Sequence, residues 1–228
     1  MAEPSRSVRP ALDSTQQILF DALCVRNIEG KTILEVGCGD GRLHRRLLEE
    51  GAASAVGIEL QKRYIATAKE QARAEELEDR TTYYSDNFME LASTLEPADI
   101  VILDKVLHCT HDPERLIRMS IGHARSLYAV AFPAPRPLLR TSIQLLSPLL
   151  RLILPFRVRF SPPERIRAWI RENGFGRVFR QETEMWHVEI YCKAATSDPD
   201  VQGAPGLAIH RDGRSVLQSM RLPRKELL

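Results

Sequence analysis

The sequence predicts an α/β fold with helices on both faces of the sheet, and three observations lead to it. The apolar run Thr32–Val36 passes into a glycine-rich turn and then into a segment of helical period, which is how a nucleotide-binding strand–turn–helix unit begins. Further apolar runs alternate with amphipathic segments along most of the chain. The first run is continuous rather than alternating, as in strands that are buried on both faces.

The composition is that of an ordinary globular protein. Of the 228 residues, 43% are hydrophobic and 27% are charged, so one domain is expected. A net charge of +2 indicates no broad field for nucleic acid, and no nucleic-acid partner is expected. The four cysteines form no C-x-x-C pair; they predict free thiols and no metal site. The N-terminus lacks the apolar core of a signal peptide, so a cytoplasmic location is expected.

Helix caps and apolar periods locate the elements of the first half. Residues 1–13 are expected to form a flexible leader. Asp13 or Ser14 can then cap a helix whose apolar face lies between Ile18 and Leu23. The elements that follow are strand 31–36, helix 41–50, strand 54–59, helix 61–78 and strand 81–84.

The second half continues the alternation and ends in a hairpin. Asp112 and Pro113 suit the N-cap and first residue of a helix, and Ser161 to Glu164 match a capping box with proline at the first helical position. The expected elements are strand 99–104, the helix from 113, strand 127–132, a helix that stops at Asn173, and strands 178–181 and 186–193. Alternation over residues 187–191 predicts a half-buried strand.

The glycine-rich turn has an informative spacing. Gly37, Gly39 and Gly41 recur at every second residue, and Glu35 stands two positions before the first. The dinucleotide fingerprint G-x-G-x-x-G fails because Arg42 occupies its third glycine position. The pattern instead resembles motif I, E/D-x-G-x-G-x-G, of the class I S-adenosylmethionine-dependent methyltransferases, and the resemblance extends over residues 14–193. It implies a Rossmann-like seven-stranded methyltransferase sheet in the order 3-2-1-4-5-7-6, with the last strand antiparallel.

The same resemblance implies S-adenosylmethionine as the cofactor, bound at the ends of the strands. Glu59 lies near the spacing of about 20 residues at which an acidic residue meets the ribose hydroxyls; the alternative is a solvated loop residue. In this family a residue placed like Asp86 binds the adenine amino group and an apolar neighbour, here Phe88, covers the ring; the alternative for Asp86 is an Asx-turn. By position, Asp104 and the following loop face the methionine end. The implied cofactor residues are Glu35, Gly37, Cys38, Gly39, Gly41, Glu59, Leu60, Asp86, Asn87, Phe88, Asp104 and Lys105.

The loop after the fourth strand resembles the segment V-L-E-H-V-P-D-P of quinone-type and other small-molecule methyltransferases. The matching residues are Val106, Leu107, Asp112 and Pro113. His108 takes the usual Glu position and Cys109 the usual His position, so the family's chemistry at these two positions does not carry over. If the acceptor needs a base, His108 and His111 are the candidates; the alternative is that they are structural.

Residues 133–160 interrupt the alternation. They are rich in Leu, Ile and Pro and carry several arginines, and they follow the fifth strand, where this superfamily inserts a lid over the acceptor. We expect a lid for a bulky lipophilic acceptor, with Arg140 and Arg151 placed to hold a carboxylate or phosphate. The alternatives are a proline-broken helical excursion and, through 138–160, peripheral contact with the inner membrane face. Residues 194–228 are polar and basic and predict a disordered tail.

The sequence therefore predicts a methyltransferase that acts on a small, lipophilic molecule at O, C or N. The N/D-P-P-Y/F motif of many amino-group methylating enzymes does not follow the fourth strand, and the Pro-Cys pair of cytosine-C5 enzymes is absent. Residues 133–160 also resemble the corresponding part of enzymes that methylate tetrapyrrole carboxylates and quinones. Two alternatives stay open: a pericyclase-like or regulatory protein that binds S-adenosylmethionine without methyl transfer, and a membrane-surface or partner-binding module with a relic cofactor site.

Overall fold

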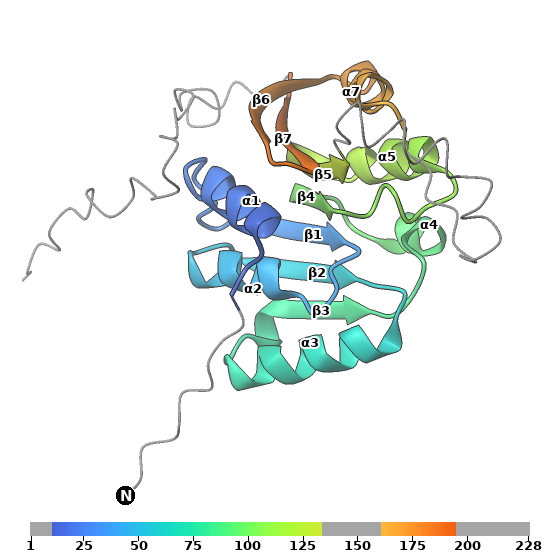
Figure 1. Cartoon of the computed structure of the whole chain (residues 1–228). Coiled ribbons are helices and arrows are strands. Elements are labelled where there is room, and N and C mark those ends of the chain that lie inside the picture. The colour runs from blue at the N-terminus through green and yellow to red at the C-terminus, as the bar shows by residue number, and fades with distance from the viewer. Residues whose placement is uncertain (1–10, 134–160, 195–228) are drawn as a thin grey trace, which may run out of the picture.

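The computed structural model describes residues 11–133 and 161–194, and it contains one seven-stranded sheet (Figure 1). The strands are β1 Thr32–Val36, β2 Ser54–Ile58, β3 Thr81–Tyr84, β4 Ala98–Asp104, β5 Ala124–Pro133, β6 Phe175–Glu182 and β7 Trp186–Lys193. Their order is β3-β2-β1-β4-β5-β7-β6. Strands β1 to β5 pair in parallel, while β7 is antiparallel to both β5 and β6. The predicted sheet order and the antiparallel last strand are confirmed.

Helices cover both faces of the sheet, as predicted (Figure 1). They are α1 Ser14–Cys24, α2 Arg42–Glu49, α3 Lys62–Ala74, α4 Phe88–Leu91, α5 Pro113–Gly122 and α7 Pro163–Glu172, with short 3₁₀ turns at Glu78–Arg80 and Ala92–Thr94. Apolar side chains of α1 and α2, such as Leu19 and Leu47, pack on one face, and those of α5 and α7, such as Ile117 and Ile170, pack on the other. Alternate β4 residues face each layer, so both faces are apolar.

Two helix starts agree with the caps predicted from the sequence. Asp13 caps α1, its carboxylate accepts the backbone N–H groups of Thr15 and Gln16, and the Gln16 side chain completes a capping box. Asp112 caps α5 and accepts the N–H of Arg115, with Pro113 as the first helical residue. Side-chain capping of this kind satisfies backbone donors that the first turn of a helix leaves free.

The predicted start of α7 is wrong by one residue. The N-cap is Pro162, with φ −56° and ψ 134°, the first helical residue is Pro163, and no side chain caps the helix. A residue that precedes proline is disfavoured in the helical region, so Pro163 keeps Pro162 extended. The capping box expected at Ser161 is therefore absent.

Three other boundaries differ from the prediction for local reasons. Helix α3 ends at Ala74 because Glu76 adopts a left-handed φ of 58°. Strands β5 and β6 begin earlier than expected, at Ala124 and Phe175, because these two residues already pair with Ala98 of β4 and Lys193 of β7. Pairing with a neighbouring strand of the sheet, rather than local preference, sets these two starts.

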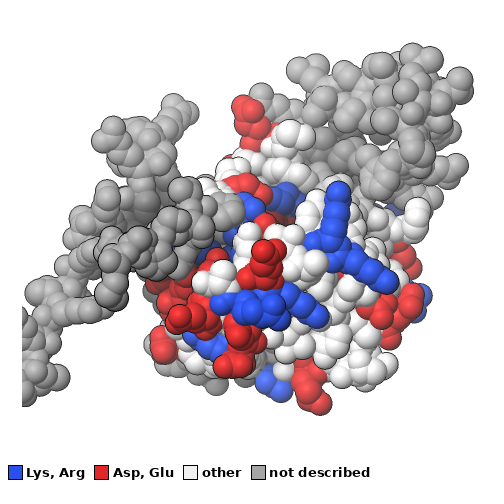
Figure 2. Space-filling model, turned by 90° about the horizontal axis from the view of Figure 1, so that it is seen from below, with Lys and Arg blue, Asp and Glu red and all other residues white. Residues whose placement is uncertain are grey.

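Several predicted features lie outside the described residues. These are most of the leader, nearly all of the 133–160 segment with Arg140 and Arg151, and the tail beyond Ala194. Within residues 11–133 and 161–194, no helix combines the length and apolar character that a membrane crossing requires. On the face seen in Figure 2, acidic and basic side chains are interspersed, in keeping with the small net charge.

Candidate functional site

A cavity of 620 Å³ opens at the carboxyl ends of the central strands. Strand β1 lies between β2 and β4, so the chain order reverses there, and ligands bind at such a switch point in open α/β sheets. The lining residues come from the ends of β1, β2 and β4 and from the loops that follow β2, β3 and β4. They are Val36, Gly37, Ile58, Glu59, Leu60, Gln61, Asp86, Asn87, Phe88, Met89, Asp104, Lys105, Val106, Cys109, Thr110, His111, Asp112 and Leu116.

The glycine turn contributes Gly37 to the cavity lining, and its conformation requires its glycines. Gly37, Gly39 and Gly41 have φ of 72°, 56° and 72°, in the left-handed region that glycine adopts without steric cost. A Cβ on Gly37 would lie 2.5 Å from Cγ2 of Val106. The turn is also tied to β2, because the carbonyl of Ile58 accepts the N–H groups of Gly37 at 2.7 Å and of Cys38 at 3.0 Å.

Glu59 brings a carboxylate to the cavity beside the turn. Its Oε2 accepts the N–H of Gly39 at 3.4 Å and its Oε1 accepts the N–H of Gln61 at 3.0 Å. The carboxylate therefore spans the gap between the glycine turn and the start of α3. Leu60, the next residue, is 70% exposed at the cavity rim.

The residues after β3 divide between the cavity and the core. Asp86 is exposed, and its Oδ1 accepts the N–H of Asn87 at 2.7 Å. Asn87 caps α4 through the N–H of Met89. Phe88 touches the cavity but is only 3% exposed and packs edge-on against His123. Met89, a partly buried apolar residue of the cavity wall, was not predicted from the sequence; its position next to Phe88 was the available signal.

Asp104 and Lys105 form a charged wall at the end of β4. Burial raises the pKa of Asp104 to about 7, although Lys105 opposes the shift. Lys105 Nζ lies 3.2 Å from Oδ2 of Asp104 and also pairs with Asp13 at the start of α1. Oδ1 of Asp104 has no hydrogen-bond partner among the described residues. Lys105 has a φ of 55°, a strained conformation of the kind that clusters at ligand sites.

Four residues of the predicted cofactor set do not line the cavity; these are Glu35, Cys38, Gly39 and Gly41. The side chains of Glu35 and Cys38 are buried behind the turn. The carboxylate of Glu35 is buried and bonds Nδ1 of His44 at 2.6 Å. The Cys38 side chain points into a cluster with Ile65 and Tyr83, and burial raises the pKa of its thiol. Neither residue lines the cavity, so each can affect a ligand there only through the backbone of the turn.

The two candidate bases point in different directions. His111 is exposed and lines the cavity. His108 is not among the lining residues; its ring lies 5.4 Å from that of Trp186 at the start of β7. Burial and the nearby Lys105 lower the pKa of His108. Cys109 Sγ lies 3.4 Å from Nε2 of His108 and itself lines the cavity.

Comparisons with known sequences agree with this geometry. Residues 33–123 match the family model of a methyltransferase domain. The ribosomal protein L11 methyltransferase of Enterobacter sp. (strain 638) is 30% identical over 87 residues, which are 38% of this chain and 30% of that protein. The ubiquinone biosynthesis O-methyltransferase of Coxiella burnetii is 30% identical over 91 residues, 40% of this chain and 38% of that protein. The chain thus spans about a third of the length of these curated relatives.

Solved structures share the fold over most of the chain at low sequence identity. Magnesium protoporphyrin IX methyltransferase from Synechocystis PCC 6803, crystallised with bound SAH, has a TM-score of 0.63 and 19% identity, covering 79% of this chain and 81% of that one. The [4+2]-cyclase SpnF has a TM-score of 0.63 and 15% identity, covering 83% and 84%.

The sheet order, the glycine turn and the cavity at its mouth define a class I methyltransferase fold. Residues 33–123 match the model of a methyltransferase domain, and the solved structures that share the fold include a methyltransferase crystallised with SAH.

Proposed function

We propose that this protein is an S-adenosylmethionine-dependent methyltransferase that acts on a small, lipophilic molecule at O, C or N. The observation that carries the proposal is the cavity itself. It brings the left-handed glycine turn, the carboxylate of Glu59 and the buried carboxylate of Asp104 to one space at the carboxyl ends of the strands. These are the groups that a nucleoside carrying an amino acid would need.

The described residues fit the parts of that cofactor. Glu59 has two carboxylate oxygens, and such a group accepts hydrogen bonds from adjacent ribose hydroxyls. Leu60, Met89 and Phe88 offer apolar surface for adenine, with Asp86 at the same end of the cavity. The free oxygen of Asp104 would accept an N–H of the methionine ammonium group, which would also favour the ionised carboxylate.

The acceptor would enter from the loop that follows β4. Methyl transfer is an in-line displacement at the sulfonium methyl group, so the protein mainly positions the two reactants and excludes water. His111 lines the cavity and is the better placed of the two candidate bases; His108 would need to turn away from Trp186. The names of two similar proteins, which concern ubiquinone biosynthesis and magnesium protoporphyrin IX, support a small-molecule acceptor. The roles of Arg140 and Arg151, and membrane contact through 138–160, remain predictions.

Calorimetric titration with S-adenosylmethionine and S-adenosylhomocysteine tests the cofactor site. We expect micromolar binding to the wild-type protein, weaker binding to Glu59→Ala and none to Gly39→Arg, because arginine would have to adopt the left-handed φ of 56° in the turn whose N–H bonds Glu59. Glu70→Ala, an exposed carboxylate on α3 away from the cavity, is the matched control. A wild-type protein that binds neither compound would contradict the proposal. If binding is found, transfer of a labelled methyl group to quinols, phenols and lipophilic acids tests the acceptor class.

A second candidate is a protein that binds S-adenosylmethionine without methyl transfer. It is favoured by the similar fold of a [4+2]-cyclase and by the position of His108, which faces Trp186 rather than the cavity. Tight cofactor binding without transfer of label to any acceptor class would support this candidate.

A further inference from the structure

A buried polar cluster lies beneath the glycine turn, on the side away from the cavity. It consists of Glu35 at the end of β1, His44 and Arg45 on α2, and Tyr83 on β3. His44 bonds Glu35 through Nδ1 at 2.6 Å and the hydroxyl of Tyr83 through Nε2 at 2.9 Å. The side chains of His44 and Arg45 are 0% and 2% exposed. None of the four residues lines the cavity.

The cluster touches the turn directly. A Cβ on Gly41 would lie 2.8 Å from two atoms of the His44 ring and 2.9 Å from the Tyr83 hydroxyl. On β2, a Cβ on Gly57 would lie 3.1 Å from Cε1 of His44. The imidazole ring of His44 thus occupies the space between Gly41 and Gly57, where it packs against the backbone of the turn.

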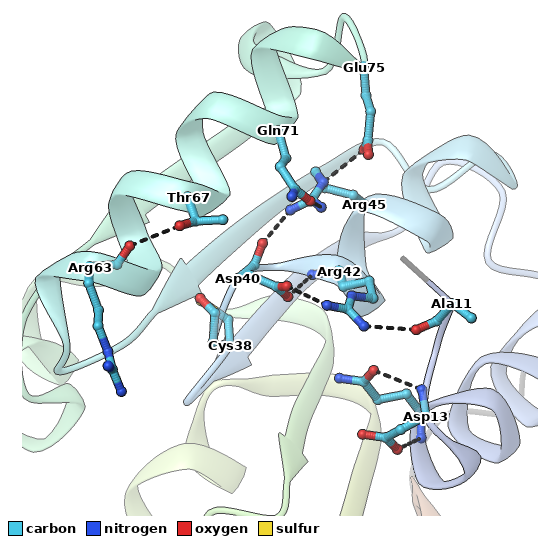
Figure 3. Close-up of polar contacts among 12 residues, drawn as sticks. Ala11, Asp13, Cys38, Asp40, Arg42, Arg45, Arg63, Thr67, Gln71 and Glu75 are labelled. Carbon is cyan, nitrogen blue, oxygen red and sulfur yellow. Dashed lines mark hydrogen bonds and ion pairs between the residues drawn. The ribbon is translucent and has the colours of Figure 1, made fainter. Parts of the chain in front are cut away.

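Arg45 ties the same turn to α3, as Figure 3 shows. Its guanidinium donates to the backbone carbonyl of Asp40, to Oε1 of Gln71 at 2.6 Å and to Oε2 of Glu75 at 2.8 Å. Arg42, on the exposed side, bonds the Asp40 carboxylate at 2.7 Å and the carbonyl of Ala11 at 2.8 Å. The turn is therefore held by side chains from α2 on two sides.

Such support has a physical reason. A turn with left-handed glycines at alternate positions has little intrinsic preference for one conformation, so a ligand that binds it would otherwise have to order it. Buried charged and polar groups are costly unless all are paired. Here Arg45 bonds the turn directly through the Asp40 carbonyl. The His44 ring, held by Glu35 and Tyr83, packs against Gly41, so a shift of the turn would disturb the packing of this paired cluster.

We propose that Glu35, His44 and Tyr83 are positioning residues, which fix the glycine turn for the cofactor without touching it. This inference rests on the proposed function for its ligand. It gives Glu35, the acidic residue of the motif, a role exerted through His44 instead of direct contact. Burial raises the pKa of Tyr83 to about 12, so its hydroxyl stays protonated and available to His44 at any ordinary pH.

A matched pair of substitutions tests the proposal. Tyr83→Phe removes the hydroxyl that bonds His44, and Tyr128→Phe removes a buried hydroxyl that bonds Ser120 at 2.9 Å on the α5 side of the sheet. Both variants should unfold at a lower temperature, but only Tyr83→Phe should weaken S-adenosylhomocysteine binding, by about tenfold, which is the lower end of what outer-shell partners contribute at metal sites. His44→Asn, which keeps a donor toward Glu35, should bind more tightly than His44→Ala.

Amide hydrogen exchange gives a readout that needs no ligand. The N–H groups of Gly37 and Cys38 are bonded to Ile58, and they should exchange faster in Tyr83→Phe than in Tyr128→Phe. Equal affinity and equal exchange in the two variants would overturn the positioning role. Faster exchange in a protein that binds no cofactor would instead contradict the proposed function and leave the support of the turn intact.

Discussion

Gly37 is the residue at which the shape of the turn is most constrained. Its φ is 72°, and a Cβ at this position would approach Val106 to 2.5 Å, so any side chain would meet both backbone strain and a clash with the cavity wall. Gly39 shares the left-handed φ, but nothing lies within 4 Å of its Cβ position. Gly39 is therefore required only for its backbone conformation, whereas Gly37 is required both for its conformation and for the lack of a side chain next to Val106.

We expect Gly37→Ala to lower the free energy of unfolding by more than Gly39→Ala does. The left-handed conformation alone costs an L-residue about 1–2 kcal/mol, and only Gly37→Ala adds the contact with Val106. Urea unfolding of the two variants measures the difference. Equal losses would mean that the Val106 side chain moves aside without cost.

Asp104 makes stability depend on pH. Its pKa is raised from 3.8 to about 7, so between these values the folded protein binds more protons at this site than the unfolded chain does. Stability from this site is therefore lost as pH rises from about 4 to about 7. The cause is burial, which disfavours the charged carboxylate more than Lys105 favours it.

The variant Asp104→Asn should remove this dependence. Relative to the wild type, its free energy of unfolding should rise by about 4 kcal/mol between pH 4 and pH 8, since the pKa is raised from 3.8 to about 7 and each pKa unit corresponds to about 1.4 kcal/mol. Urea unfolding across this range measures it. Asp112→Asn, at the exposed cap of α5, is the control for the effect of an Asp-to-Asn substitution on the pH profile of stability. If the two variants have parallel pH profiles, the pH dependence does not come from Asp104.

At the scale of elements, the residues just before α1 connect this helix to the carboxyl ends of the central strands. Asp13 caps the helix and pairs with Lys105 at the end of β4, while the carbonyl of Ala11 accepts a hydrogen bond from Arg42 after the glycine turn. Figure 3 shows Ala11 and Asp13 on the side of the turn where Arg42 lies. One end of α1 is therefore connected both to the segment that follows the glycine turn and to the end of β4.

Two substitutions at Asp13 separate the cap from the ion pair. Asp13→Asn keeps the helix cap and loses the charge, whereas Asp13→Ala loses both. Because the Asp13 side chain is 50% exposed, the ion pair should contribute little, and the cap should contribute about 1 kcal/mol. Thermal unfolding should place Asp13→Asn near the wild type and Asp13→Ala below it. A large loss in Asp13→Asn would show that the contact with Lys105 dominates.

For the whole molecule, ligand binding should raise stability without any change of fold. A compound that binds only the folded state at one hundred times its dissociation constant adds about 2.7 kcal/mol. We therefore expect S-adenosylhomocysteine to raise the unfolding temperature of the wild type in a concentration-dependent way, and adenosine alone to raise it less. Differential scanning fluorimetry measures both shifts. An unfolding temperature that does not change with S-adenosylhomocysteine concentration would indicate that the cavity does not bind the cofactor.

The architecture was predictable because its signals are local. Continuous apolar runs, the spacing of Gly37, Gly39 and Gly41, and the caps Asp13 and Asp112 each depend on a few neighbouring residues. The partners of Glu35 were not predictable, since His44 and Tyr83 come from other elements and show no common spacing with it. The direction of His108 likewise depends on Trp186, which reaches it only once the last strand has paired.

That last strand has a consequence for how the domain is completed. Strand β7 lies between β5 and β6, so the final stretch of the sheet fills an internal position. A chain that ends before Trp186 would lose the strand that pairs with both β5 and β6. The unpaired edge of β5 would then be exposed to other chains. During synthesis the sheet would stay open at this place until residues 186–193 had emerged, which makes the C-terminal hairpin the step that closes the domain.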